Sequence, residues 1–176
     1  MTEFINDDLG DFGATFSQSR KYRFALWRIW DRKLPLVMFI GLNPSTANET
    51  NSDPTIRSVG RISKANGFGG FYMMNCFPLV STDPKALKPF YLSANSFEQS
   101  QYSRNHEMLQ SVSLKCHEVV FAWGNFPLVK ELGIAEKYLL NMFPNAKALS
   151  LNKNGSPKHP LYCKSDTKFI PYHKTV

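Results

Sequence analysis

The segment FIGLNPSTANET (residues 39–50) begins as an apolar run and breaks off at an Asn-Pro pair. The longer run LPLVMFIGL (residues 34–42) has the length and composition of a buried strand. Small hydroxylated and amide residues follow Pro44, which is typical of a chain leaving a sheet. The meaning of this strand end depends on what ends the other strands.

Apolar runs and helix signals alternate along the rest of the chain. Strands are predicted at residues 36–42, 70–75, 118–123 and 146–151. A helix is predicted between Asp53 as N-cap, with Pro54 at its first position, and Gly67 just past its end. Further helices are predicted from STDPKAL (81–87), over 96–114, and over 127–143 with Pro127 at its start.

This alternation predicts an α/β fold with three layers, α/β/α, around a central four-stranded parallel sheet. YRFALWRIWD (22–31) adds an N-terminal strand, which RKLP can turn into a hairpin with the strand at 36–42. No repeat or linker divides the sequence, so residues 1–176 are expected to form one domain, with residues 1–20 as a polar leader.

Composition narrows the functional classes. The longest apolar run is far too short to cross a membrane, and the acidic, polar start does not resemble a secretory signal. The three cysteines show no metal-binding spacing and cannot all pair, which favours a reduced, cytoplasmic setting without metal or other cofactor. The net charge of +7 favours polyanionic partners only slightly. A monomer is expected.

In an open parallel sheet the carboxyl ends of the strands lie along one edge, where ligands bind. The four predicted strands end at Asn43, Asn75, Trp123 and a loop that holds His159. Taken singly, Asn43 reads as a turn residue and Trp123 as core, while Asn75 serves a structural bond or a ligand equally well. Their convergence on one rim is what predicts a site.

A basic surface is predicted beside this rim. Arg57, Arg61 and Lys64 follow one another at helical spacing, directly after the Asn43 loop. A solvated helix face is the ordinary explanation, and a phosphate-contacting stripe is the alternative. The candidate nucleic-acid contacts are Ser45, Thr46, Arg57, Arg61, Lys64, Lys153 and Lys158, and Phe68 is a candidate for stacking on a base.

Four motifs, GLNPSTA, DPTIR, GFGGFYMMN and SPKHPLY, together resemble a bacterial and phage family of unknown function defined by a G-L-N-P-S-T-A signature. The similarity extends from about Tyr22 to Tyr162. It implies no particular activity.

The same landmarks resemble, more distantly, the uracil-DNA glycosylase superfamily. GLNP is similar to its first strand end, YMMN to its base-reading strand, VVFAWG to its third strand and HPLY to its final loop. The resemblance implies that Asn43 positions water, Asn75 reads the base edge and His159 stabilises the departing base, with Phe68 and Trp123 near the base. A glycosylase must extrude its target base, which fits a basic rim and a tight aromatic pocket.

Two departures from that superfamily keep alternatives open. Asn43 supplies no carboxylate, and HPLY lacks the Ser-Pro that follows His-Pro in the superfamily motif. The first hypothesis is an N-glycosyl hydrolase acting on a modified or deaminated base in DNA or a nucleotide. The second is a module that binds nucleic acid or a nucleotide without chemistry. The third is a metabolic or partner-binding protein whose rim holds an unrelated small ligand.

Overall fold

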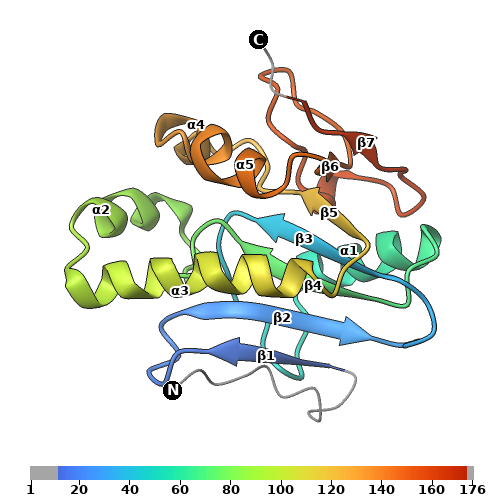
Figure 1. Cartoon of the computed structure of the whole chain (residues 1–176), viewed down its shortest axis with the longest axis horizontal. Coiled ribbons are helices and arrows are strands. Elements are labelled where there is room, and N and C mark those ends of the chain that lie inside the picture. The colour runs from blue at the N-terminus through green and yellow to red at the C-terminus, as the bar shows by residue number, and fades with distance from the viewer. Residues whose placement is uncertain (1–11, 174–176) are drawn as a thin grey trace.

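The structure is a computed structural model that describes residues 12–173. It is a mixed α/β fold built on one seven-stranded sheet in the order β1-β2-β4-β3-β5-β6-β7 (Figure 1). The strands are β1 Phe12–Phe16, β2 Arg23–Ile29, β3 Leu36–Gly41, β4 Gly70–Asn75, β5 Glu118–Phe121, β6 Lys147–Ala148 and β7 Ile170–Pro171.

The four strands predicted from the sequence, β4, β3, β5 and β6, are neighbours in the sheet and run parallel to one another. The sheet is nevertheless larger than the four strands expected. Antiparallel strands extend it on both sides, with β1 and β2 at one edge and β7 at the other. Residues 1–11 of the expected leader lie outside the described residues, and Phe12–Phe16 of that leader form β1.

The predicted hairpin between residues 22–31 and 36–42 is wrong. Strand β2 pairs with β1 and with β4, so β4 lies between β2 and β3. The Gly69-Gly70 pair permits this arrangement, because a Cβ at Gly69 would lie 1.9 Å from the carbonyl oxygen of Asp31. Trp30 and Asp31 both donate main-chain hydrogen bonds to the Gly69 carbonyl. The glycines therefore let the start of β4 close onto the end of β2.

The helices lie between the parallel strands in the sequence. They are α1 Pro54–Ala65, α2 Leu87–Leu92, α3 Ser96–Ser113, α4 Leu128–Glu131 and α5 Leu140–Met142. Helix α1 confirms the predicted signals, since Asp53 accepts a hydrogen bond from the Ile56 amide and Gly67 has a positive φ of 82°. The single helix predicted over 127–143 is wrong, because Gly133 (φ 63°) separates α4 from the π-helical turn Ala135–Leu139 that leads into α5.

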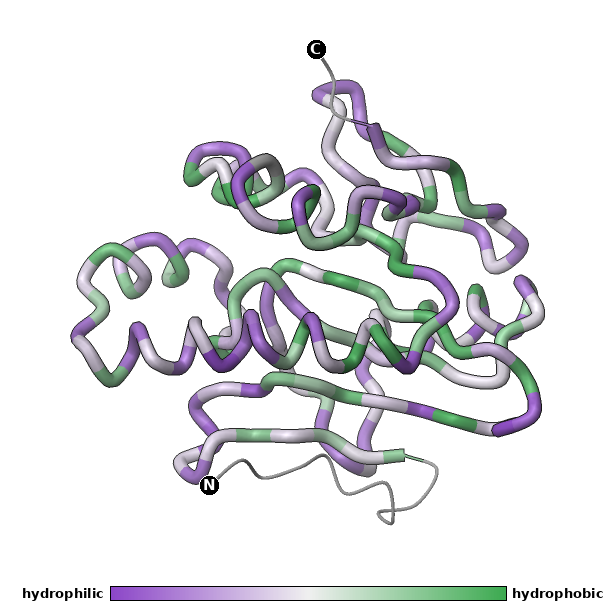
Figure 2. The backbone as a smooth tube through the Cα atoms, in the orientation of Figure 1, coloured by the Kyte–Doolittle hydropathy of each residue, from purple (hydrophilic) through white to green (hydrophobic). Residues whose placement is uncertain are grey.

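Hydrophobic residues fill both faces of the sheet. Alternate residues of β3 point to opposite sides, so that Met38 and Ile40 join one core cluster and Val37 and Phe39 join the other. The first cluster includes residues of α2 and α3, and the second includes residues of α1. Figure 2 shows the hydrophobic colour concentrated in the central strands and alternating along α3. None of the helices within residues 12–173 has the length and apolar character that crossing a membrane requires.

Candidate functional site: a cavity at the rim of the parallel strands

A cavity of about 440 Å³ lies where the parallel strands end. Asn43, Asn75, Trp123 and His159, which the sequence analysis expects to converge, all line it, and Ser45 does too. The other lining residues are Arg23, Gly41, Leu42, Asp53, Thr55, Ile56, Met73, Ser81, Thr82, Pro84, Gly124, Asn125, Phe126, Leu161 and Tyr162. The topology of the sheet therefore brings together side chains that are more than a hundred residues apart in sequence.

The side-chain amide of Asn43 is held by the loop that follows β4. Its nitrogen donates to the main-chain carbonyls of Ser81 at 2.8 Å, Pro44 at 3.0 Å and Leu79 at 3.4 Å. A carboxylate at this position could donate to none of these three oxygens. Asn43 thus fixes the loop with its nitrogen, which leaves its side-chain oxygen as the atom that can accept a hydrogen bond in the cavity.

Asn75, the last residue of β4, is 2 % exposed, and its amide nitrogen is buried without a hydrogen-bond partner among the described residues. Gly41 on the neighbouring strand makes room for this side chain, because a Cβ there would lie 2.9 Å from the Asn75 side-chain oxygen. The main-chain carbonyl of Asn75 accepts a 2.9 Å hydrogen bond from the side chain of Asn105 on α3. A buried donor without a partner is costly, which favours a ligand acceptor in the complete site.

His159 lies in the loop before the short 3-10 turn Pro160–Tyr162 (η3), which it caps. Its Nδ1 accepts a 3.2 Å hydrogen bond from the Leu161 amide. Burial lowers the pKa of His159 below its ordinary value, and the negative charge of Asp53 opposes this shift. Burial therefore favours the neutral imidazole, and because Nδ1 accepts a hydrogen bond, the neutral ring carries its proton on Nε2.

The sequence analysis did not predict two charged residues that line this cavity, Arg23 and Asp53. Arg23 of β2 is 3 % exposed, and burial lowers its pKa to about 10, a shift that the charge of Asp53 opposes. Asp53 was predicted only as a helix cap, yet its carboxylate also lines the cavity. The available signal was an arginine inside an aromatic, strand-forming run, because a buried guanidinium needs partners.

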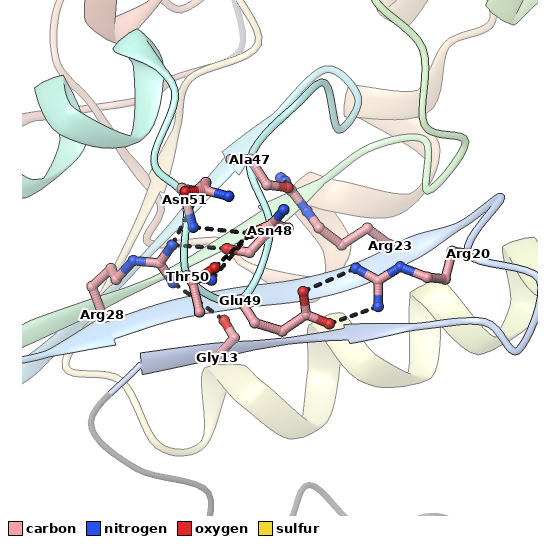
Figure 3. Close-up of polar contacts among 9 residues, drawn as sticks. All are labelled: Gly13, Arg20, Arg23, Arg28, Ala47, Asn48, Glu49, Thr50 and Asn51. Carbon is pink, nitrogen blue, oxygen red and sulfur yellow. Dashed lines mark hydrogen bonds and ion pairs between the residues drawn. The ribbon is translucent and has the colours of Figure 1, made fainter.

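Three arginines hold the loop that forms this side of the rim (Figure 3). Arg23 donates to the carbonyl of Ala47 at 2.8 Å, and Arg28 donates to the carbonyls of Asn48 and Asn51 at 2.8 and 3.3 Å. Arg20 forms a two-pronged ion pair with Glu49. Side chains of β2 thus donate to three carbonyls of the loop after β3, and the turn before β2 supplies the ion pair with Glu49.

The predicted basic surface does not line the cavity. Arg57 donates to the Ser52 carbonyl, Arg61 contacts Ser58 at 3.1 Å, and the Lys64 ammonium lies 4.9 Å from the centre of the Trp30 ring. Thr46, Lys153 and Lys158 are also absent from the lining, and Thr46 and Lys153 are exposed.

Phe68, predicted to stack on a base, is buried on the α1 side of the sheet. It stacks on Phe169 with a distance of 5.7 Å between ring centres. It is not part of the cavity lining. Trp123 combines both roles considered for it, since it packs 4.8 Å from Phe121, centre to centre, and still lines the cavity.

The residue types that usually bind metals are not grouped within residues 12–173. Within residues 12–173 no three His, Cys, Asp or Glu side chains lie close enough to bind one ion. The cysteines are free, and burial raises the thiol pKa of Cys116 to about 12 and that of Cys163 above its usual value. The polar groups that line the cavity are amides, hydroxyls, one imidazole, one carboxylate and one guanidinium.

Comparison with protein families identifies this chain. It belongs to the family described as "Protein of unknown function (DUF1643)", whose model matches residues 23–161. The match begins at Arg23 and ends at Leu161, and both residues line the cavity. Neither the search of curated proteins nor the search of solved structures found a match.

Proposed function

We propose that this member of the DUF1643 family recognises a nucleobase in the rim cavity and hydrolyses the N-glycosidic bond of a modified or deaminated base in DNA or a nucleotide. The observation that carries the proposal is that Asn43, Asn75 and His159 line one cavity at the ends of parallel strands. Their order along the chain is the order of the motifs that resemble the uracil-DNA glycosylase superfamily.

Base recognition is assigned to Asn75. An amide presents one donor and one acceptor side by side, which is the pattern needed to read the edge of a pyrimidine. Its buried nitrogen has no hydrogen-bond partner among the described residues, so a carbonyl oxygen of the base would supply the missing acceptor. Trp123 and Phe126 give this part of the cavity apolar walls against which a flat ring can pack.

Stabilisation of the departing base is assigned to His159. As the glycosidic bond breaks, negative charge gathers on the base and positive charge on the sugar. A neutral imidazole with its proton on Nε2 donates a hydrogen bond to the base oxygen as that charge develops. Because Nδ1 is already held by the Leu161 amide, the ring is oriented before the ligand arrives.

Two other side chains are assigned to positioning the attacking water and to stabilising the positive charge on the sugar. The amide oxygen of Asn43 accepts a hydrogen bond from the attacking water, while the amide nitrogen remains bound to the loop carbonyls. As the water oxygen bonds to the sugar carbon and the bond to the base breaks, the proton that the water loses goes to the departing base anion. The carboxylate of Asp53 supplies the negative charge that Asn43 does not, and so favours the positively charged sugar in the transition state.

The direct test uses end-labelled oligonucleotides that carry deaminated, alkylated or mismatched bases, with a parallel panel of nucleotides. We expect base release, detected as alkali-sensitive breaks or free base, by the full chain and not by His159→Ala. Lys33→Ala, on an exposed residue outside the cavity and outside the predicted basic surface, serves as the control and should retain activity. Lack of product from every substrate, or equal product from His159→Ala, would contradict hydrolysis.

A second function, binding without chemistry, is favoured by the contacts of Asn43. Its amide nitrogen is engaged by three carbonyls, and the position provides no carboxylate. Salt-sensitive binding of the same oligonucleotides, unchanged in Asn43→Ala and His159→Ala and without any product, would select this function.

A further inference from the structure

We propose that Arg23 forms an anion-binding subsite at one end of the rim cavity and that this subsite takes the phosphate of a nucleotide ligand. The assignment of the phosphate to a nucleotide rests on the proposed function. The anion site itself rests on the contacts of Arg23, which are independent of any assumption about the base.

The guanidinium of Arg23 is buried but has few partners. The residue is 3 % exposed, and its Nη1 donates to the Ala47 carbonyl at 2.8 Å. Its Nε is buried without a hydrogen-bond partner, and the residue makes no salt bridge with the carboxylates of residues 12–173. A guanidinium carries five N–H donors, and for Arg23 the Nε donor is buried with no acceptor among the described residues.

Holding the loop after β3 does not explain this residue. Arg28, five residues further along the same strand, holds the same loop with two of its nitrogens, and Figure 3 shows it beside Asn48 and Asn51. Its Nε donates to the Ser52 hydroxyl, its Nη1 to the Trp27 carbonyl and its Nη2 to the carbonyls of Asn48 and Asn51. Arg28 is half-buried and does not line the cavity. Arg23 is the more deeply buried of the two and makes fewer contacts.

Burial of a charge is unfavourable unless something compensates it. Burial lowers the pKa of Arg23, yet at about 10 the group still carries its charge at neutral pH. Besides Arg23, the titratable side chains that line the cavity are Asp53, His159 and Tyr162, and Asp53 is the carboxylate among them. The Asp53 carboxylate accepts from the Ile56 amide and is not within ion-pair distance of Arg23. An anion in the cavity would complete the coordination of the guanidinium.

The surroundings of Arg23 suit a phosphate. The planar fork of an arginine suits the paired oxygens of a phosphate. Ser45 and Thr55 add hydroxyl groups, and both residues line the cavity beside the start of α1. Strand β5, which leads to Trp123, is three strands across the sheet from β2, so a phosphate at Arg23 would leave the part of the cavity beside Trp123 for the base.

The test is isothermal titration of the full chain with three kinds of probe: inorganic phosphate, deoxynucleosides, and the corresponding 5′- and 3′-monophosphates. In the wild type we expect a monophosphate to bind about tenfold or more tightly than its nucleoside, since hydrogen bonds to charged groups are strong. In Arg23→Gln the monophosphate should bind no more tightly than its nucleoside, and the affinity for the nucleoside should stay unchanged. Arg28→Gln, the matched control from the same loop clamp, should preserve the tighter binding of the monophosphate.

Other outcomes separate the two proposals. Equal affinity for nucleoside and monophosphate in the wild type, or equal loss of the tighter monophosphate binding in both arginine variants, would overturn the phosphate site and leave base recognition standing. Arg23-dependent binding of inorganic phosphate without any nucleoside binding would retain the anion site and overturn the proposed function. If Arg23→Gln does not fold, thermal stabilisation of the wild type that saturates at low millimolar phosphate supports the site, since the general effect of phosphate on proteins grows without saturation at higher concentration. Stabilisation that does not saturate overturns it.

Discussion

Gly124 packs directly against His159: a Cβ atom at Gly124 would lie 3.1 Å from the Cβ of His159. Gly124 also has a positive φ of 80°, and its amide donates a 3.0 Å hydrogen bond to the Pro157 carbonyl. The end of the third parallel strand thus fixes the loop that carries the imidazole. Only a residue without a side chain allows both the turn and the contact.

Replacement of Gly124 by alanine should therefore cost stability and also displace His159. We expect about 1–2 kcal/mol of destabilisation from the left-handed backbone, together with a clear loss of base binding. Gly67→Ala is the matched control, since Gly67 has a φ of 82° and no atom within 4 Å of its would-be Cβ. Urea denaturation and ligand titration of both variants check this. Unchanged binding by Gly124→Ala would show that His159 does not depend on the contact.

Replacement of Asn43 by aspartate should destabilise the protein rather than improve a catalyst. A carboxylate would face the carbonyls of Pro44, Leu79 and Ser81, which now accept hydrogen bonds from the amide. We expect a loss of about 2–4 kcal/mol at neutral pH. This deficit should shrink in acid, because a protonated aspartate can donate to one of the three oxygens. Ser45→Ala, on the same loop, should change stability by less than about 0.5 kcal/mol. Chemical denaturation at several pH values would reveal a stable Asn43→Asp protein if this explanation is wrong.

Asp53→Asn separates the two roles of this residue. Asparagine caps a helix as well as aspartate does, so α1 should keep its stability within about 1 kcal/mol. The cavity, however, loses its carboxylate, and we expect base release to fall by about tenfold or more. The pKa of His159 should also fall further, because Asp53 now opposes the lowering that burial causes. Proton NMR titration of the imidazole measures that shift, and normal base release by the variant would remove Asp53 from the mechanism.

The buried state of His159 also predicts a pH-dependent stability. Its folded pKa lies below the unfolded value of about 6.5, so protonation favours the unfolded chain. The stability that this residue contributes is present above about pH 6.5 and is lost as the pH falls through the lowered folded pKa. The wild type should therefore lose stability relative to His159→Asn between about pH 7.5 and pH 5. Melting curves of the two proteins across that range would show a constant difference if His159 stayed exposed.

Local chemistry explains what the sequence could predict. Asp53, Pro54 and Gly67 mark both ends of α1 through contacts within a few residues, and the structure has the helix where they place it. The rim followed from a general property of parallel strands, so the convergence of Asn43, Asn75 and His159 could be expected without any knowledge of the loops. Their chemical roles remain predictions.

Long-range pairing explains what the sequence could not predict. The partner of β2 is set by Gly69 and Gly70, forty residues further along the chain, and not by the turn that follows β2. The position of Arg23 in the cavity depends on the path of the Ala47 loop, which the local pattern does not specify. The basic residues of α1 have the spacing of one helix face. On that face Arg57 donates to the Ser52 carbonyl and Lys64 lies over the Trp30 ring, so these side chains contact neighbouring residues and do not line the cavity.

The wall of the cavity extends from Arg23 on the second strand to Tyr162 in the final 3-10 turn. Pieces from both ends of the polypeptide are therefore needed before any ligand can be enclosed, and a nascent chain released from the ribosome before its last quarter has no site to occupy. A ligand can therefore bind the cavity only after the whole tertiary structure has formed. We expect a bound ligand to raise the midpoint of global unfolding and not to protect one segment alone.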